Sequence, residues 1–234
     1  MRGCLSVLLI AALFLGAVAW LGGPPIAGAL VTAGLTASGL DARRMDVDVE
    51  SDPPIKVGIG QADRVTIEAD DIDWNGLKAR ALDLALDDVD IIGRRAATAE
   101  GRLTGAELPN VDPPGSLATV EIDGPADDAT VTVTIDGETV EAMAIEAFEA
   151  RLGVRPDSAT LEAPNRIRIR SGGLELAGGI EVSPAGDVHV VVPLGTLTVV
   201  DGDPSVPFQL TDATVESGTL VLTGSIDLND LMGG

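Results

Sequence analysis

The chain has little cysteine, histidine or aromatic content: its 234 residues include one Cys, one His, three Phe, two Trp and no Tyr. A single cysteine excludes an intramolecular disulfide and a multi-thiolate metal site, and one histidine leaves little for a histidine-based one. Basic residues are also few, because 15 Lys and Arg face 37 Asp and Glu, for a net charge of -22. So negative a chain repels nucleic acid. We therefore predict no metal, no cofactor and no nucleic-acid partner.

What is present is apolar: 45% of the residues are hydrophobic, too many for a disordered acidic chain. Residues 4–21 carry no charge, and a helix of this length rises about 27 Å, close to the thickness of a bilayer core. Arg2 precedes the stretch, which keeps the N-terminus cytoplasmic and sends the following chain outward. The small residues Ala17 and Ala19 equally suit a cleavage site. Residues 1–22 are thus predicted to be a membrane anchor or a signal peptide, with the rest at the membrane or secreted to the envelope.

Two further segments have helical patterns. Residues 26–40 are apolar or small on every side, so a helix there must be buried or lie against lipid. Residues 138–152 place four glutamates in one sector and Val140, Met143 and Ala144 opposite, and the pattern ends at Gly153. The second helix is therefore amphipathic.

Most of the remaining chain alternates apolar and polar residues with the period of a half-buried strand. Before the second helix, this pattern covers residues 45–49, 55–59, 65–69, 82–86, 97–103, 120–122 and 131–135. The strand at 82–86 continues to Val89 in phase only if one residue bulges at Asp87-Asp88. After the second helix, the alternating pattern covers residues 159–161, 167–169, 174–176, 180–182, 188–192, 197–199 and 220–222. The order suggests one domain, residues 23–234, of two weakly similar halves at 25–108 and 116–228.

Motifs for catalysis are weak, and we predict no catalytic residue. His189 alternates with valines on the solvent face of a strand, and no Gly-x-Ser-x-Gly elbow supplies a nucleophile. Residues 71–76 match the start of a calcium loop, but Leu82 stands where a bidentate Glu is needed, so a hairpin turn is favoured. Carboxylates are too abundant for their spacing to be informative. A carboxylate hydrolase stays a third hypothesis, which requires two facing acids and a raised pKa.

One basic stripe stands out in this acidic chain. Arg166, Arg168 and Arg170 alternate with Ile167 and Ile169, which puts three guanidinium groups on one strand face. They fit ion pairs with acids on a neighbouring strand. They also fit contact with anionic lipid headgroups, which arginine suits. Both interpretations are open from the sequence.

The order of short motifs in the strand-rich part resembles a known family. Ser51-Asp52-Pro53-Pro54-Ile55-Lys56-Val57-Gly58 is followed by Val65-Thr66-Ile67-Glu68-Ala69, then by Trp74-Asn75-Gly76-Leu77 and Leu82-Asp83-Leu84-Ala85-Leu86-Asp87-Asp88-Val89. Gly218-Thr219-Leu220-Val221-Leu222-Thr223-Gly224 closes the series. This order resembles the LmeA-like phospholipid-binding family of bacterial cell envelopes. Ile55 departs from it, because an aromatic residue usually follows the proline there.

The resemblance implies an α+β fold in which a curved antiparallel sheet wraps around two main helices and encloses an acyl-chain cavity. It also implies phospholipid or a membrane surface as partner, a role in envelope lipid or lipoglycan maintenance, and no catalysis. The candidate lining residues are Leu30, Leu35, Leu77, Leu82, Leu84, Leu86, Met143, Phe148, Ile167 and Ile169. The alternative function is a non-catalytic structural or adhesive β-rich ectodomain, whose core would be solid.

Overall fold

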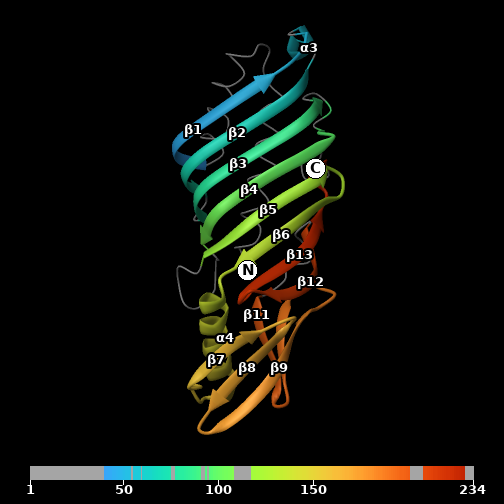
Figure 1. Cartoon of the computed structure of the whole chain (residues 1–234). Helices are drawn as coiled ribbons and strands as arrows, with labels where there is room; N and C mark the ends of the chain where they lie inside the picture. Colours follow the sequence, from blue (N-terminus) through green and yellow to red (C-terminus); the bar gives the residue numbers. More distant parts are fainter. Residues whose placement is uncertain are drawn as a thin grey trace.

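A computed structural model describes residues 40–53, 55–58, 60–74, 77–90, 93, 95–107, 117–200 and 208–229. These residues form an elongated, mostly-β molecule with an eight-stranded sheet, a five-stranded sheet and one long helix (Figure 1). All neighbouring strands within the two sheets are antiparallel, as the alternating pattern and short connections predict. The leader at 1–22 lies outside the described residues. Within the described ranges, no helix is long and apolar enough to cross a bilayer.

The eight-stranded sheet has the order β1-β2-β3-β4-β5-β6-β13-β12. Its strands are β1 (Leu40–Glu50), β2 (Gln61–Trp74), β3 (Leu77–Asp90), β4 (Thr98–Glu107), β5 (Leu117–Pro125), β6 (Ala129–Ile135), β12 (Phe208–Glu216) and β13 (Thr219–Ile226). Chain neighbours pair from β1 to β6, so this part is a meander. The hairpin of β12 and β13 then returns and pairs through β13 with β6, which places the first and the last described strands in one sheet.

The five-stranded sheet has the order β11-β10-β9-β8-β7. Its strands are β7 (Ser158–Glu162), β8 (Arg166–Ser171), β9 (Leu174–Val182), β10 (Val188–Val192) and β11 (Gly195–Val200). Helix α4 (Gly137–Leu152) packs against β7 and β11, the two outer strands of this sheet. The Asp136 carboxylate accepts a hydrogen bond from the Glu138 amide at 3.1 Å, and Gly153 ends the helix at φ 71°. The predicted helix at 138–152 is confirmed.

The expected sheet wrapped around two main helices is not seen. Among the described residues α4 is the only long helix, and it packs on the smaller sheet. The other predicted helix, at 26–40, lies almost wholly outside the described part, and its last residue, Leu40, begins β1. The antiparallel sheet is confirmed, but the chain divides its strands between two sheets.

The predicted strand at 55–59 is also wrong. Residues Ile55–Gly58 form the short helix α3, in which the Lys56 amide donates a hydrogen bond to the Pro53 carbonyl at 3.0 Å. The Gly60 amide donates a hydrogen bond of the same spacing to the Val57 carbonyl, and the Val57 side chain is buried. Three alternating residues beside a proline pair are too few to distinguish a strand from a helical turn.

Irregular positions let the sheet bend while it keeps one face buried. In β3 the buried residues Leu86 and Val89 are three apart, and Asp88 between them has φ 49°. The expected change of phase at Asp87-Asp88 is therefore present, but the pairing with β2 shows no register shift there, so it is not the expected one-residue bulge. Asp71 in β2 has the same φ, and Gly105 in β4, at φ 64°, lies where the pairing with β5 shifts. The pairing of β2 with β3 keeps its register at Asp71 and Asp88, so the bulge is the one at Gly105, and a bulge bends a strand and increases its twist.

An ion pair ties α3 to β2. Nζ of Lys56 lies 2.7 Å from Oδ1 of Asp63, and the Asp52 amide donates to Oδ2 of the same carboxylate at 2.5 Å. The Lys56 hydrogen bond, followed by that from Asp52, holds the pKa of Asp63 below its ordinary value. A carboxyl group whose pKa is lowered by folding stabilises the fold above its unfolded pKa, and this contribution is lost as the pH falls through the folded pKa.

We expect Lys56→Met to raise the pKa of Asp63 toward its ordinary value, because the main stabiliser of the carboxylate is removed. The unfolding midpoint of the variant should then fall less than that of the unchanged chain when the pH drops from neutral to below about 4. A carboxyl NMR titration and denaturant unfolding across that range measure both effects. Lys78→Met, at an exposed lysine of β3, is the control. An Asp63 pKa equal in both variants would contradict the pairing.

Candidate functional site

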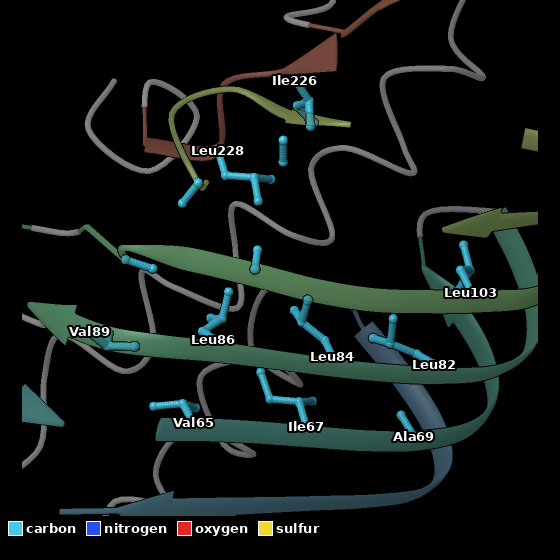
Figure 2. Close-up of a cluster of buried hydrophobic side chains, with 14 of the residues drawn as sticks. Val65, Ile67, Ala69, Leu82, Leu84, Leu86, Val89, Leu103, Ile226 and Leu228 are labelled. Carbon is cyan, nitrogen blue, oxygen red and sulfur yellow. The ribbon is translucent and has the colours of Figure 1, made fainter. Parts of the chain in front are cut away.

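One face of the eight-stranded sheet is built from aliphatic side chains. We call it the apolar face and define it by Val65, Ile67, Ala69, Leu82, Leu84, Leu86, Val89, Leu103, Ile226 and Leu228. Figure 2 shows the β2 and β3 members in neighbouring rows, with Ile226 and Leu228 reaching the cluster from the C-terminal end. All are at most 8% exposed, and Val65, Ile67 and Leu86 are at 0%.

The strand alternation makes the sheet two-faced. Between the buried residues of β2 and β3 stand Thr66, Glu68 and Asp83, which line the opposite, polar face. Gly101 of β4 lies under the apolar face, since a Cβ there would come within 2.9 Å of a methyl group of Leu84. No helix or strand in the described ranges packs extensively over the apolar face, because β2, β3 and β4 chiefly contact their sheet neighbours and α3.

A second apolar cluster fills the other end of the molecule. It joins α4, the five-stranded sheet and the strands β12 and β13. Phe148 of α4 is 3% exposed, and Ile167 and Ile169 of β8 are at 0%. This cluster is enclosed by described elements on both sides, so it is a packed core that holds the two sheets and the helix together.

The polar face of the larger sheet carries a hollow of about 380 Å³. Its lining is Arg64, Thr66, Glu68, Asp83, Leu84, Ala85, Glu100, Gly101, Arg102, Glu121, Ile122 and Asp123. Arg64 pairs with Asp87 at 3.1 Å, and Arg102 pairs with Glu121. Over the described residues, no group of three His, Cys, Asp or Glu side chains could hold a metal ion.

Neither sequence motif with catalytic or calcium-binding potential gains support. Asp71, in the calcium-like segment, pairs with Arg43 at 3.0 Å, and Trp74 pairs with Leu77, which confirms a hairpin there. His189 is half-buried on β10, with Nε2 3.8 Å from Asp187. Shifted carboxyl pKa values occur at Asp63 and Glu175, and both are lowered. A general acid needs the opposite shift.

The arginine stripe is held largely by ion pairs. Nε of Arg168 lies 2.8 Å from Glu162, and the same guanidinium also pairs with Glu175. The hydrogen bond to Glu162 is the main contact that raises the pKa of Arg168, and the charge of Glu175 adds to it. The hydrogen bond from Arg170, together with the charge of Arg168, lowers the pKa of Glu175. Arg170 lies 3.1 Å from Glu175. The ion-pair interpretation is thus confirmed for two of the three arginines, while Arg166 is exposed and has no ion pair with a described residue. The headgroup role stays a prediction.

Comparison with known protein families decides the assignment. The model of the family described as LmeA-like phospholipid-binding matches residues 18–225. The chain belongs to this family. The resemblance drawn from the order of the strand motifs is therefore confirmed. No curated protein and no solved structure matches the chain.

Within this LmeA-like chain, the candidate lining residues divide between the two apolar clusters. Leu82, Leu84 and Leu86 lie side by side on the apolar face. Met143, Phe148, Ile167 and Ile169 are buried around α4 and β8, in the part of the molecule that holds the second cluster. Leu30, Leu35 and the side chain of Leu77 lie outside the described part. The structure thus unites three of the ten residues with the apolar face and separates four others from them.

Several members of the apolar face were not among the candidate lining residues. Val65 and Ile67 alternate as clearly as the β3 leucines, so the signal was available. Leu103 of β4 had a weaker one, because small residues surround it. Leu228 follows β13 and carried no sequence signal for a place on the apolar face. Its position depends on a contact between distant parts of the chain, because the Leu228 amide donates a hydrogen bond to the Ala126 carbonyl at 2.7 Å.

Proposed function

We propose that this LmeA-like chain binds phospholipid with the acyl chains lying along the apolar face. The observation that carries the proposal is the layer of buried aliphatic side chains shared by β2, β3 and β4, over which no helix or strand of the described ranges packs extensively. Family membership supports phospholipid as the ligand class. A fully aliphatic surface suits a ligand whose only uniform chemical feature is a run of methylene groups.

The energetics are favourable for such a ligand. Each methylene removed from water contributes about 0.8 kcal/mol, so ten buried methylenes supply roughly 8 kcal/mol before the cost of ordering the chain is subtracted. Neighbouring strands lie about 4.8 Å apart, so the face crosses β2 to β4 over roughly 10 Å and continues along each strand. The contact area is therefore sufficient for part of an acyl chain.

We further propose a non-catalytic role in the cell envelope. The charge-free stretch at residues 4–21 supports export or anchoring of a single domain at 23–234. The family description names binding and no reaction. The resemblance to this family implies maintenance of envelope lipid or lipoglycan as that role.

Phospholipid uptake by the full, delipidated chain tests this function, with two neighbouring residues on opposite faces of β3 as a matched pair. Leu84→Gln introduces an amide on the apolar face, whereas Ala85→Gln introduces the same amide on the polar face. We expect Leu84→Gln to retain much less labelled phospholipid and Ala85→Gln to retain as much as the unchanged chain, at a temperature where all three are folded by circular dichroism. Equal retention by the two variants would contradict the proposal.

A further inference from the structure

Large exposed hydrophobic residues gather in one part of the molecule. Among the described residues they are Leu152, Val154, Leu174, Val191 and Leu194. Leu174 is 68% exposed, Leu194 59% and Val154 55%. None belongs to the eight-stranded sheet, although that sheet contains most of the described strands. Exposed aliphatic residues confined to one region indicate a contact surface.

The three most exposed of these residues, Val154, Leu174 and Leu194, lie in or beside three turns at the same end of the five-stranded sheet, and Leu152 and Val191 are close to these turns in the chain. Leu174 begins β9, and Leu194 lies in the turn between β10 and β11; because β9 and β10 are antiparallel, the two turns face one direction (Figure 1). Val154 lies in the connection from α4 to β7. The Asp157 carboxylate ties this connection to the β8–β9 turn by accepting the Gly172 amide at 3.0 Å. We call residues 152–156, 171–174 and 192–195 the distal tip.

The distal tip departs from the acidic character of the chain. Residues 146–175 contain five arginines and five acids, so this segment is neutral in a chain of net charge -22. Residues 190–200, which include the β10–β11 turn, contain no charged residue. Arg151 and Arg155 flank Leu152 and Val154, and Arg170 precedes the β8–β9 turn. Aliphatic side chains bordered by arginine are the composition that enters the interfacial layer of an anionic bilayer.

We propose that the distal tip docks on an anionic phospholipid membrane, with Val154, Leu174 and Leu194 entering the interface. The three side chains are carried on separate turns, an arrangement suited to a soft layer that each can enter independently. Arg155 and Arg170 pair with Glu149 and Glu175, so their charge is largely balanced within the protein, whereas Arg151 is exposed and has no ion pair with a described residue, which leaves its charge to attract anionic lipid. The proposal rests on residues other than the apolar face, so it can fail while the proposed acyl-chain site stands.

Environment-sensitive fluorophores on the full chain test the docking. With Cys4 replaced by serine, a single cysteine is introduced by Leu174→Cys, Leu194→Cys or, as control, Ala185→Cys. Ala185 lies in the exposed β9–β10 turn at the opposite end of the same sheet, roughly 25 Å along β9. Because all labelled chains share the same N-terminus, any insertion of residues 4–21 affects the three probes equally. The labelled chains are mixed with phosphatidylglycerol vesicles.

We expect a blue shift and protection from aqueous iodide at positions 174 and 194, and neither change at position 185. Interfacial segments enter about 5–10 Å, which reaches the tip and not the control. The substitutions L174E and L194E together should abolish the shift of a probe at Val154→Cys. Probes at the tip that stay accessible to iodide would overturn the proposal. Protection that rises with protein concentration in the absence of vesicles would also overturn it, because the tip would then bind a second copy of the chain.

Discussion

Gly224→Ala is expected to destabilise the fold more than any other single methyl addition at the described glycines of the eight-stranded sheet. A Cβ at this position of β13 would overlap the carbonyl oxygen of Gln209 in β12. The added Cβ would also lie 2.9 Å from the Gln209 carbonyl carbon and 3.0 Å from Cα of Leu210. These are backbone atoms of a paired strand, so they cannot move without breaking the β12–β13 ladder. We expect a loss of more than about 4 kcal/mol, the range reached only when a specific mechanism such as overpacking operates.

Gly179→Ala is the matched control for this prediction. Gly179 lies in β9, and the one atom of the described residues within 4 Å of a Cβ there is a Glu181 carboxylate oxygen at 3.9 Å. Its unfolding midpoint in urea should lie close to that of the unchanged chain, whereas Gly224→Ala should unfold at much lower urea or be unfolded in buffer. Equal midpoints for the two variants would show that β12 and β13 are not as close as the structure places them.

Phe148→Ala is expected to cost about 3–5 kcal/mol of unfolding free energy, the usual cost of truncating a buried phenylalanine. Phe148 is 3% exposed and belongs to the cluster that joins α4 to both sheets. Guanidinium unfolding measures the loss. Leu152→Ala, at an exposed residue in the last turn of the same helix, should change the stability by no more than about 0.5 kcal/mol.

The Phe148→Ala variant also separates core packing from ligand binding. Because we assign Phe148 to a packed core and the acyl chains to the apolar face, Phe148→Ala should retain phospholipid at any temperature where it is folded. Loss of phospholipid with an unchanged unfolding midpoint would place the ligand in the second cluster, and our assignment of the two clusters would be wrong.

Strands and the amphipathic helix could be predicted because their signals are local. Alternation marked β2 and β3, and the spacing of Val140 and Met143 with a terminal glycine marked α4. Strand β12 escaped because its pairing with β13 shifts between Leu210 and Asp212, which breaks the alternation of its buried residues. The strand expected at 55–59 failed because three alternating positions also fit one turn of helix.

The candidate site could be predicted only as a list of alternating apolar residues. Leu84 and Ile169 have the same local pattern, each a buried aliphatic residue between two less buried neighbours on a strand. Strand order, which decides that Leu84 joins the larger sheet and Ile169 the smaller, depends on pairings between distant parts of the chain. The division into two sheets depends on these same pairings. No local pattern therefore separates a residue of the apolar face from one of the second cluster.

Photo-crosslinking with a phospholipid that carries a diazirine in its acyl chain tests the central claim most directly. After irradiation of the full chain and proteolysis, mass spectrometry identifies the modified peptides. We predict modification in peptides from residues 61–74, 77–90 and 98–107, which contain the β2, β3 and β4 parts of the apolar face. Modification confined to residues 137–200, or absent from those three strands at saturating phospholipid, would contradict the account.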